Sequence, residues 1–256
     1  MFGICMLTVR RLREPASIIL LLIGCLFSFF VSGTEAFEIS NIHGSSANEL
    51  IASNKILLGT VLLVGLGILI SIFNGATEIP RDISSRVIFI LLSKPISRLE
   101  YVGGKFLGVL VIGLGSTIVW ITLMLVFRVA LSSGAAAHLS GSQILAQYTC
   151  ALMLVPITAL AICSSCCFGD VVSMIVTVVY LLLSFAMVIA PIVAALSPAA
   201  AGKIVLAVYF FFPNLCLFLQ SYPTFWASVA IVVYAFCSST LFLLLGKTVF
   251  EHGDVD

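Results

Sequence analysis

The sequence predicts an all-α integral membrane protein with six transmembrane helices. Of its 256 residues, 61% are hydrophobic and only 9% are charged, and the mean hydropathy is +1.25. A soluble surface of this size needs more charge than that. The apolar residues also gather in runs close to the roughly 20 residues that cross a bilayer as helix, with about 17 the lower limit. Six runs qualify, at 16–32, 56–74, 106–131, 144–168, 171–197 and 224–246.

Basic residues divide unequally between the two sides that these spans define. Nine of the twelve Lys and Arg residues fall on the side that holds both chain ends and the segment between spans two and three. Only Lys55, Arg128 and Lys203 fall on the other side. The positive-inside rule therefore predicts that both termini are cytoplasmic. We expect a multi-pass protein of the cell inner (cytoplasmic) membrane.

The first 14 residues mix apolar side chains with Arg10, Arg11 and Arg13. This composition favours a cytoplasmic interfacial helix at 1–14, held by anionic lipid headgroups; the alternative is a disordered basic tail. The apolar run at 16–32 is longer than most signal-peptide cores, and further spans follow it. We therefore expect an uncleaved first span rather than a signal peptide.

The segment between spans two and three carries the strongest local signal. Pro95 disfavours helical conformation at Lys94, and Ser97 followed by Glu100 is the pattern of a capping box, which starts a new helix. The helix before Pro95 is predicted to be amphipathic from the apolar stripe Ile83, Val87, Ile88 and Leu91. Two helices are therefore expected to meet at a corner within a cytoplasmic loop at 75–105.

The later spans contain residues that kink or end helices. Pro156 is expected to kink span four, and Pro191 span five. Between these spans, Gly169 can end one helix and Asp170 can cap the next, which predicts a very short turn.

The stretch at 198–223 is apolar, but Pro213 and Asn214 interrupt it. It predicts an outer hairpin, re-entrant or interfacial, whose backbone is covered by protein. The alternative is a seventh span, which would place the C-terminus outside.

Residue patterns for chemistry are absent from the sequence. Gly246-Lys247-Thr248 resembles the end of a phosphate-binding loop, but the glycine required five residues before Gly246 is Leu241. The spacing of Cys163 and Cys166 favours close helix packing over a metal site. We therefore predict no catalytic, cofactor-binding or metal-binding residues in this chain, and no nucleic-acid partner.

The cores of the six runs carry no Asp, Glu, His or Arg. Because transporters driven by ion gradients often keep such groups near the midplane, an external energy source is favoured. Arg128 lies near the outer end of span three, where we expect its side chain to reach the interface.

The segment between spans two and three resembles the coupling-helix segment of type-2 ABC exporter permeases, most closely the NosY-like branch. The resemblance lies in the order of its parts: a charged stretch, the helix before Pro95, the capped start at Ser97 and the following span. The positions that match are Glu78, Leu91, Leu92, Ser93, Lys94, Pro95, Ile96, Ser97, Arg98, Glu100, Gly104 and Lys105. Arg86 and Val87 stand where many members of the family carry Gly-Thr.

The resemblance implies that residues 1–256 form a single transmembrane permease domain of an ATP-driven exporter. It implies a second permease subunit, as a homodimer, two cytoplasmic ABC ATPase subunits that bind ATP and Mg, and contact with membrane lipid. Alternating access would occur at the dimer interface, with spans two and five lining the path. The residues expected to couple to the ATPase are Glu78, Arg81, Arg86, Lys94, Pro95, Ser97, Arg98, Glu100, Lys105 and Asp170. The alternative is a membrane channel or an assembly scaffold without an ATPase partner.

Overall fold

The computed structural model describes residues 2–11, 19, 21–32, 46–87, 97–131, 141–186, 215–219 and 225–252. Every regular element in these ranges is a helix, which confirms the all-α prediction for this part of the chain. The labelled elements are α1 (Phe2–Arg11), α3 (Ser46–Ser84), α5 (Arg98–Leu131), α6 (Gly141–Ala151), α7 (Leu154–Cys167), α8 (Asp170–Ala186), the 3-10 helix η3 (Leu215–Leu219) and α11 (Phe225–His252).

Among the described residues, four helices are long and apolar enough to cross a membrane. They are Leu58–Ser84, Arg98–Ala130, Gln143–Cys167 and Ser228–Val249. Two shorter apolar helices, Leu21–Ser32 and Asp170–Phe185, fall within the first and fifth predicted spans. These helices fit a multi-pass membrane protein, whereas the full count of six spans stays a prediction.

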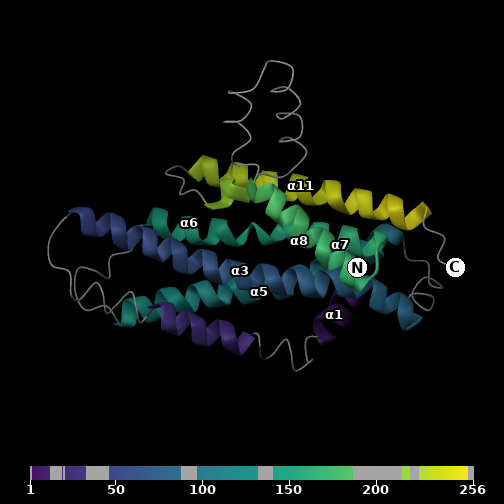
Figure 1. The fold of residues 1–256 in the computed structure, drawn as a ribbon, viewed down its shortest axis with the longest axis horizontal. Coiled ribbons are helices and arrows are strands. Elements are labelled where there is room, and N and C mark those ends of the chain that lie inside the picture. The colour runs from purple at the N-terminus through teal and green to yellow at the C-terminus, as the bar shows by residue number, and fades with distance from the viewer. Residues whose placement is uncertain are drawn as a thin grey trace, which may run out of the picture.

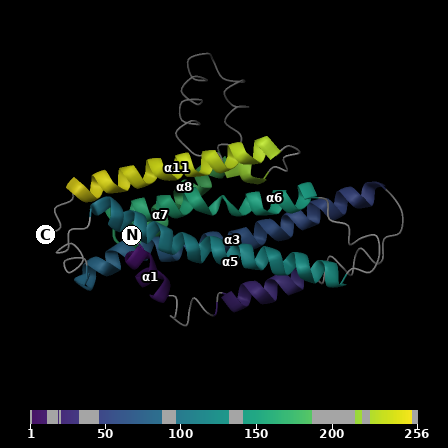
Figure 2. The same cartoon turned by 180° about the vertical axis from the view of Figure 1, so that it is seen from behind.

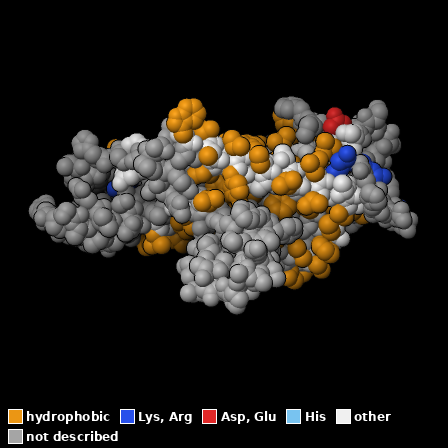
Figure 3. Space-filling view, turned by 90° about the horizontal axis from the view of Figure 1, so that it is seen from above, with side chains coloured by type: hydrophobic (Ala, Val, Ile, Leu, Met, Phe, Trp, Pro, Cys, Tyr) orange, Lys and Arg blue, Asp and Glu red, His pale blue; other side chains and the backbone are white. Residues whose placement is uncertain are grey.

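The long helices lie side by side in an elongated bundle (Figure 1). Both ribbon views place α1, the C-terminal end of α3 and the C-terminal end of α11 at the same end of this bundle (Figures 1 and 2). On the face seen in Figure 3, the described side chains along the middle of the bundle are mainly hydrophobic, and most of the described charged side chains lie toward one end. This distribution is the one expected when the middle of the bundle lies in lipid.

Helix α7 is the centre of the packing. It contacts α3, α5, α8 and α11, and most of its residues are buried. A Cβ placed on Gly75 of α3 would lie 2.8 Å from the Cβ of Ala161, and one on Gly246 of α11 would lie 3.3 Å from the Cα of Cys163. Small residues at these positions allow the helix backbones to approach closely.

The expected irregularity of span four lies one turn before Pro156. Helix α6 ends at Ala151 and α7 begins at Leu154, with a turn at Leu152 and Met153. Pro156 has no N–H to donate to the carbonyl of Leu152, and its ring crowds that carbonyl. The Leu152 carbonyl instead accepts from the N–H of Val155 at 3.1 Å. The backbone therefore tightens locally into 3-10-type bonding.

The turn between α7 and α8 is as short as predicted, but its cap is displaced by one residue. Gly169 supplies the first accepting carbonyl, to the N–H of Ser173 at 2.9 Å. Asp170 is therefore the first residue of α8 rather than its N-cap. A carboxylate in the first turn is still favourable there because it faces the positive end of the helix dipole.

The predicted interfacial helix at 1–14 is described as α1, and one of its faces packs on protein. Ile4 is 6% exposed and Thr8 is 1% exposed, and a Cβ on Gly108 of α5 would lie 2.6 Å from the Thr8 Cβ. Because Gly108 has no side chain, Thr8 of α1 can pack directly against α5 at this position.

Of the predicted outer hairpin at 198–223, only η3 lies within the described residues. Its Leu215 and Phe218 are buried, and the thiol of Cys150 donates to the carbonyl of Phe218 at 3.0 Å. This part of the hairpin is therefore covered by protein, as expected.

Candidate functional site

The start of α5 is fixed by the predicted capping box. The hydroxyl of Ser97 accepts from the N–H of Glu100 at 3.2 Å, and the N–H of Ser97 donates to Oε2 of Glu100 at 3.0 Å. These two reciprocal bonds satisfy backbone groups that a helix end otherwise leaves free. The corner predicted around Lys94 and Pro95 lies outside the described residues, but the helix that leaves it begins as expected.

Helix α3 continues through Pro80 to Ser84, so residues 75–84 of the cytoplasmic loop predicted at 75–105 are helical. Residues 88–96 of that loop lie outside the described residues. After Ser84 the chain turns at Arg86, whose φ is 57°. This is the left-handed region, which side chains with a Cβ rarely adopt.

A buried cluster of charges joins α3 to α5 just inside these two helix ends. The Nζ of Lys105 lies 2.5 Å from Oε2 of Glu78 and 2.8 Å from Oδ2 of Asp82. The Tyr101 hydroxyl donates to the same Asp82 oxygen at 2.8 Å. The side chains of Lys105 and Asp82 are fully buried, and that of Glu78 is 10% exposed.

The spacing of these four residues along their helices brings them together. Glu78 and Asp82 are one turn apart on α3, and Tyr101 and Lys105 are one turn apart on α5, so each pair projects from one face of its helix. An ammonium group placed between two carboxylates satisfies charges that would be very costly to bury alone. The cluster therefore holds the two helix ends together.

The predicted coupling residues consequently fall into two groups. Glu78 and Lys105 are buried against each other rather than exposed. The other described members are exposed or half-buried at the helix ends and at the α7–α8 turn: Arg81, Arg86, Ser97, Arg98, Glu100 and Asp170. Among the described coupling residues, this second group is the one whose side chains are accessible at the surface.

Sequence reasoning missed Asp82 and Tyr101. Their only signal was spacing, since Asp82 follows Glu78 by four residues and Tyr101 precedes Lys105 by four. Such spacing shows which residues share a helix face, but not which second helix that face meets.

Two polar residues are buried toward the opposite end of the bundle. Arg128 of α5 is 5% exposed and Gln147 of α6 is 2% exposed. Arg128 lies in the last turn of α5, but its side chain is enclosed by protein instead of extending into lipid headgroups as expected. A buried arginine requires compensating polar contacts, which a lipid-facing anchor does not.

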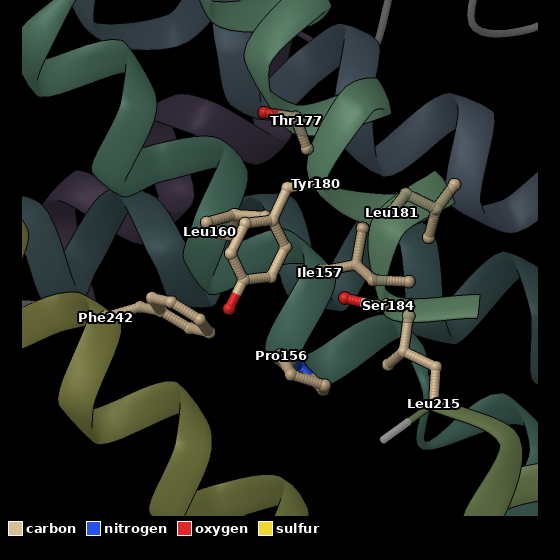
Figure 4. Close-up of a pocket in the computed structure, with 9 residues that line it drawn as sticks. All are labelled: Pro156, Ile157, Leu160, Thr177, Tyr180, Leu181, Ser184, Leu215 and Phe242. Carbon is tan, nitrogen blue, oxygen red and sulfur yellow. The ribbon is translucent and has the colours of Figure 1, made fainter. Parts of the chain in front are cut away.

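A small crevice lies between α7, α8, α11 and η3 (Figure 4). The Tyr180 ring of α8 meets Phe242 of α11 edge-on, with ring centroids 5.8 Å apart. The close-up shows Pro156 and Ile157 along the α7 side of the crevice. Its walls are mainly aliphatic and aromatic, and its volume of about 10 Å³ has room for no more than a water-sized molecule.

Among the described residues, no group of three or more His, Cys, Asp or Glu side chains is placed to hold a metal ion. No protein-family model matches this sequence, and no curated protein matches it. The arrangement of α3 and α5 is thus the feature from which a function can be argued.

Proposed function

We propose that this chain is the membrane subunit of an ATP-driven type-2 ABC exporter. In this proposal six spans cross the inner membrane with both termini in the cytoplasm. The chain pairs with a second copy of itself, and two cytoplasmic ATPase subunits bind ATP and Mg. Their movement is passed to the spans through the segment that joins α3 to α5.

The observation that carries the proposal is the capped start of α5 together with the charged end of α3. Helix α5 starts at a capping box formed by Ser97 and Glu100, and exposed Arg81 and Arg86 lie at the facing end of α3. A rigid helix start flanked by exposed cations suits docking to an acidic cleft on a soluble partner.

The backbone at position 86 adds support from an independent direction. Many members of the family carry glycine where this chain has Arg86, and the φ of 57° at Arg86 is one that glycine adopts without strain. The conformation at this position thus fits the residue preference of the family, even though the side chain departs from it.

Charge reversal at the corner tests the proposal. Exposed ion pairs contribute about 0.2 to 1 kcal/mol each, so the double variant Arg86→Glu/Arg98→Glu is expected to weaken ATPase binding by roughly 2- to 30-fold. Binding is measured by titrating the purified ATPase onto the chain in lipid nanodiscs. Lys247→Glu, at the same end of the bundle on α11, is the matched control and should leave the affinity unchanged.

Unaltered affinity in the double variant would contradict the docking role of these charges. If the unaltered chain binds no ATPase at all, the alternative function, a membrane channel or assembly scaffold without an ATPase partner, would be favoured instead.

A further inference from the structure

Helices α3 and α5 meet along one continuous antiparallel seam. Gly67 of α3 faces Thr117 of α5, and Ser71, one turn further along α3, faces Gly113, one turn back along α5. The Glu78–Lys105 ion pair continues the same register toward the helix ends. Residues one turn apart on α3 therefore face residues about one turn apart on α5, in the opposite chain direction.

The helix backbones are as close as side chains allow. A Cβ on Gly67 would lie 2.0 Å from the Thr117 Oγ1, and one on Gly113 would lie 2.1 Å from the Ser71 Oγ. Leu154 of α7 closes over the same place, with its Cδ2 at 3.0 Å and 3.4 Å from these two positions. Such small-residue contacts leave no room for the helices to slide or to admit another molecule.

The buried cluster closes the seam at its charged end. Lys105 lies between Glu78 and Asp82 with no exposed surface, and Tyr101 donates to Asp82. Parting α3 from α5 here would separate opposite charges that are buried by protein, where their attraction is stronger than at an exposed surface. The seam is therefore held by close packing in its middle and by ions at its end.

We propose that α3 and α5 move as one rigid unit during the transport cycle. A push on the segment that joins them then displaces both helices together, and the transported molecule does not pass between them. This inference rests on the proposed function for the meaning of the motion, while the rigidity itself can be measured without an ATPase.

A reversible cross-link tests it. In Ser71→Cys/Gly113→Cys, made in a background without the eight native cysteines, the two Cβ atoms would lie about 3.4 Å apart, close to the 3.5 to 4.5 Å range of disulfides. The complex with its ATPase is assayed for ATP hydrolysis before oxidation, after oxidation and after reduction. Because the bond joins groups already in lasting contact, we expect changes of less than about twofold.

Loss of hydrolysis on oxidation that is restored by reduction would overturn the rigid unit. Gly67→Cys/Thr117→Cys, with Cβ atoms about 3.3 Å apart, is the second variant if the first does not fold. The single cysteine variants are the controls for oxidation itself.

A second measurement needs no ATPase. Spin labels at Leu69 of α3 and Val111 of α5, both exposed, are placed in chains diluted with an excess of unlabelled chain, so that pairs of labels on two different copies are rare. They should give one narrow distance distribution in nanodiscs. Two separate distances would overturn the rigid unit. If the distance is single but no ATPase binds the parent chain, the rigid unit stands and the proposed function fails.

Discussion

Lys105 is the side chain on which the charged end of the α3–α5 pair depends. Its ammonium group is fully buried between Glu78 and Asp82. Removing one partner from a buried ion pair typically destabilises a protein by about 3 to 5 kcal/mol, because the remaining charge stays buried. We expect Lys105→Met to lower the thermal stability of the purified chain in detergent strongly.

Neutralising the whole cluster is the matched control for that prediction. In Glu78→Met/Asp82→Leu/Lys105→Met no buried charge is left from these three residues, and replacing buried ion pairs by apolar residues of similar volume is often close to neutral. The triple variant should therefore unfold at a higher temperature than Lys105→Met alone. Equal unfolding temperatures for the parent and Lys105→Met would show that the cluster does not stabilise the helix pair.

Arg86 offers a test of the backbone at the end of α3. Its φ of 57° costs a residue with a Cβ roughly 1 to 2 kcal/mol, whereas glycine accepts it freely. Arg86→Gly is expected to raise thermal stability, while Arg86→Ala, which removes the same charge but keeps the Cβ, should not. If both variants behave alike, the side chain rather than the backbone determines stability here.

Local signals of single residues were predictable, and contacts between distant residues were not. The bonds of Ser97 and Glu100 form within one turn, so four residues of sequence suffice to predict them. Asp82 and Tyr101 are nineteen positions apart, and only the packing of α3 on α5 brings them together. The burial of Arg128 depends on tertiary structure in the same way.

Among the elements, the α3–α5 seam makes the sharpest prediction. Gly67→Ala would place a methyl group against Thr117, which is stiff because it is β-branched and whose hydroxyl is bonded to the Gly113 carbonyl at 2.8 Å. Overpacking of this kind costs about 1 to 3 kcal/mol. We expect a clear loss of thermal stability.

Gly65 provides the control on the same helix, since a Cβ there would meet nothing within 4 Å. Gly65→Ala should be neutral or slightly stabilising, because alanine favours helix. A similar loss in both variants would mean that helix α3 responds to any substitution, rather than to crowding at the seam.

Element boundaries were predicted where the backbone chemistry is decisive. Pro156 breaks the bonding of the preceding turn, and Gly169 separates α7 from α8. The continuation of α3 beyond the second predicted span, from residue 74 to Ser84, could not be foreseen from the segment alone, because the buried cluster that favours it joins two helices.

At the scale of the whole molecule, the fold class was predictable from the sequence, and the number of membrane-spanning helices was less so. Long apolar runs require helices in lipid, so the all-α class follows from composition. Four helices reach spanning length, and Leu21–Ser32 and Asp170–Phe185 are shorter. The corner at Lys94 and Pro95 and most of 198–223 lie outside the described residues. The corner and the outer hairpin therefore stay predictions.

Topology is the first prediction for the whole chain. Six spans, with most basic residues on one side, place both termini in the cytoplasm. A reporter enzyme that is active only outside the cytoplasm, fused after Asp256, should therefore stay silent, whereas the same reporter fused after Lys55 should be active. Activity at Asp256 would support the seven-span alternative.

The central claim is that this chain converts ATP hydrolysis on a partner into movement of its spans. The most direct measurement is to purify the tagged chain from its native membrane and assay the preparation for hydrolysis of Mg-ATP. We expect an ABC ATPase to co-purify in equal amount, hydrolysis to depend on its presence, and Arg86→Glu/Arg98→Glu to reduce both. A folded chain that brings no ATPase, or a preparation whose hydrolysis is unaffected by the double variant, would contradict the account.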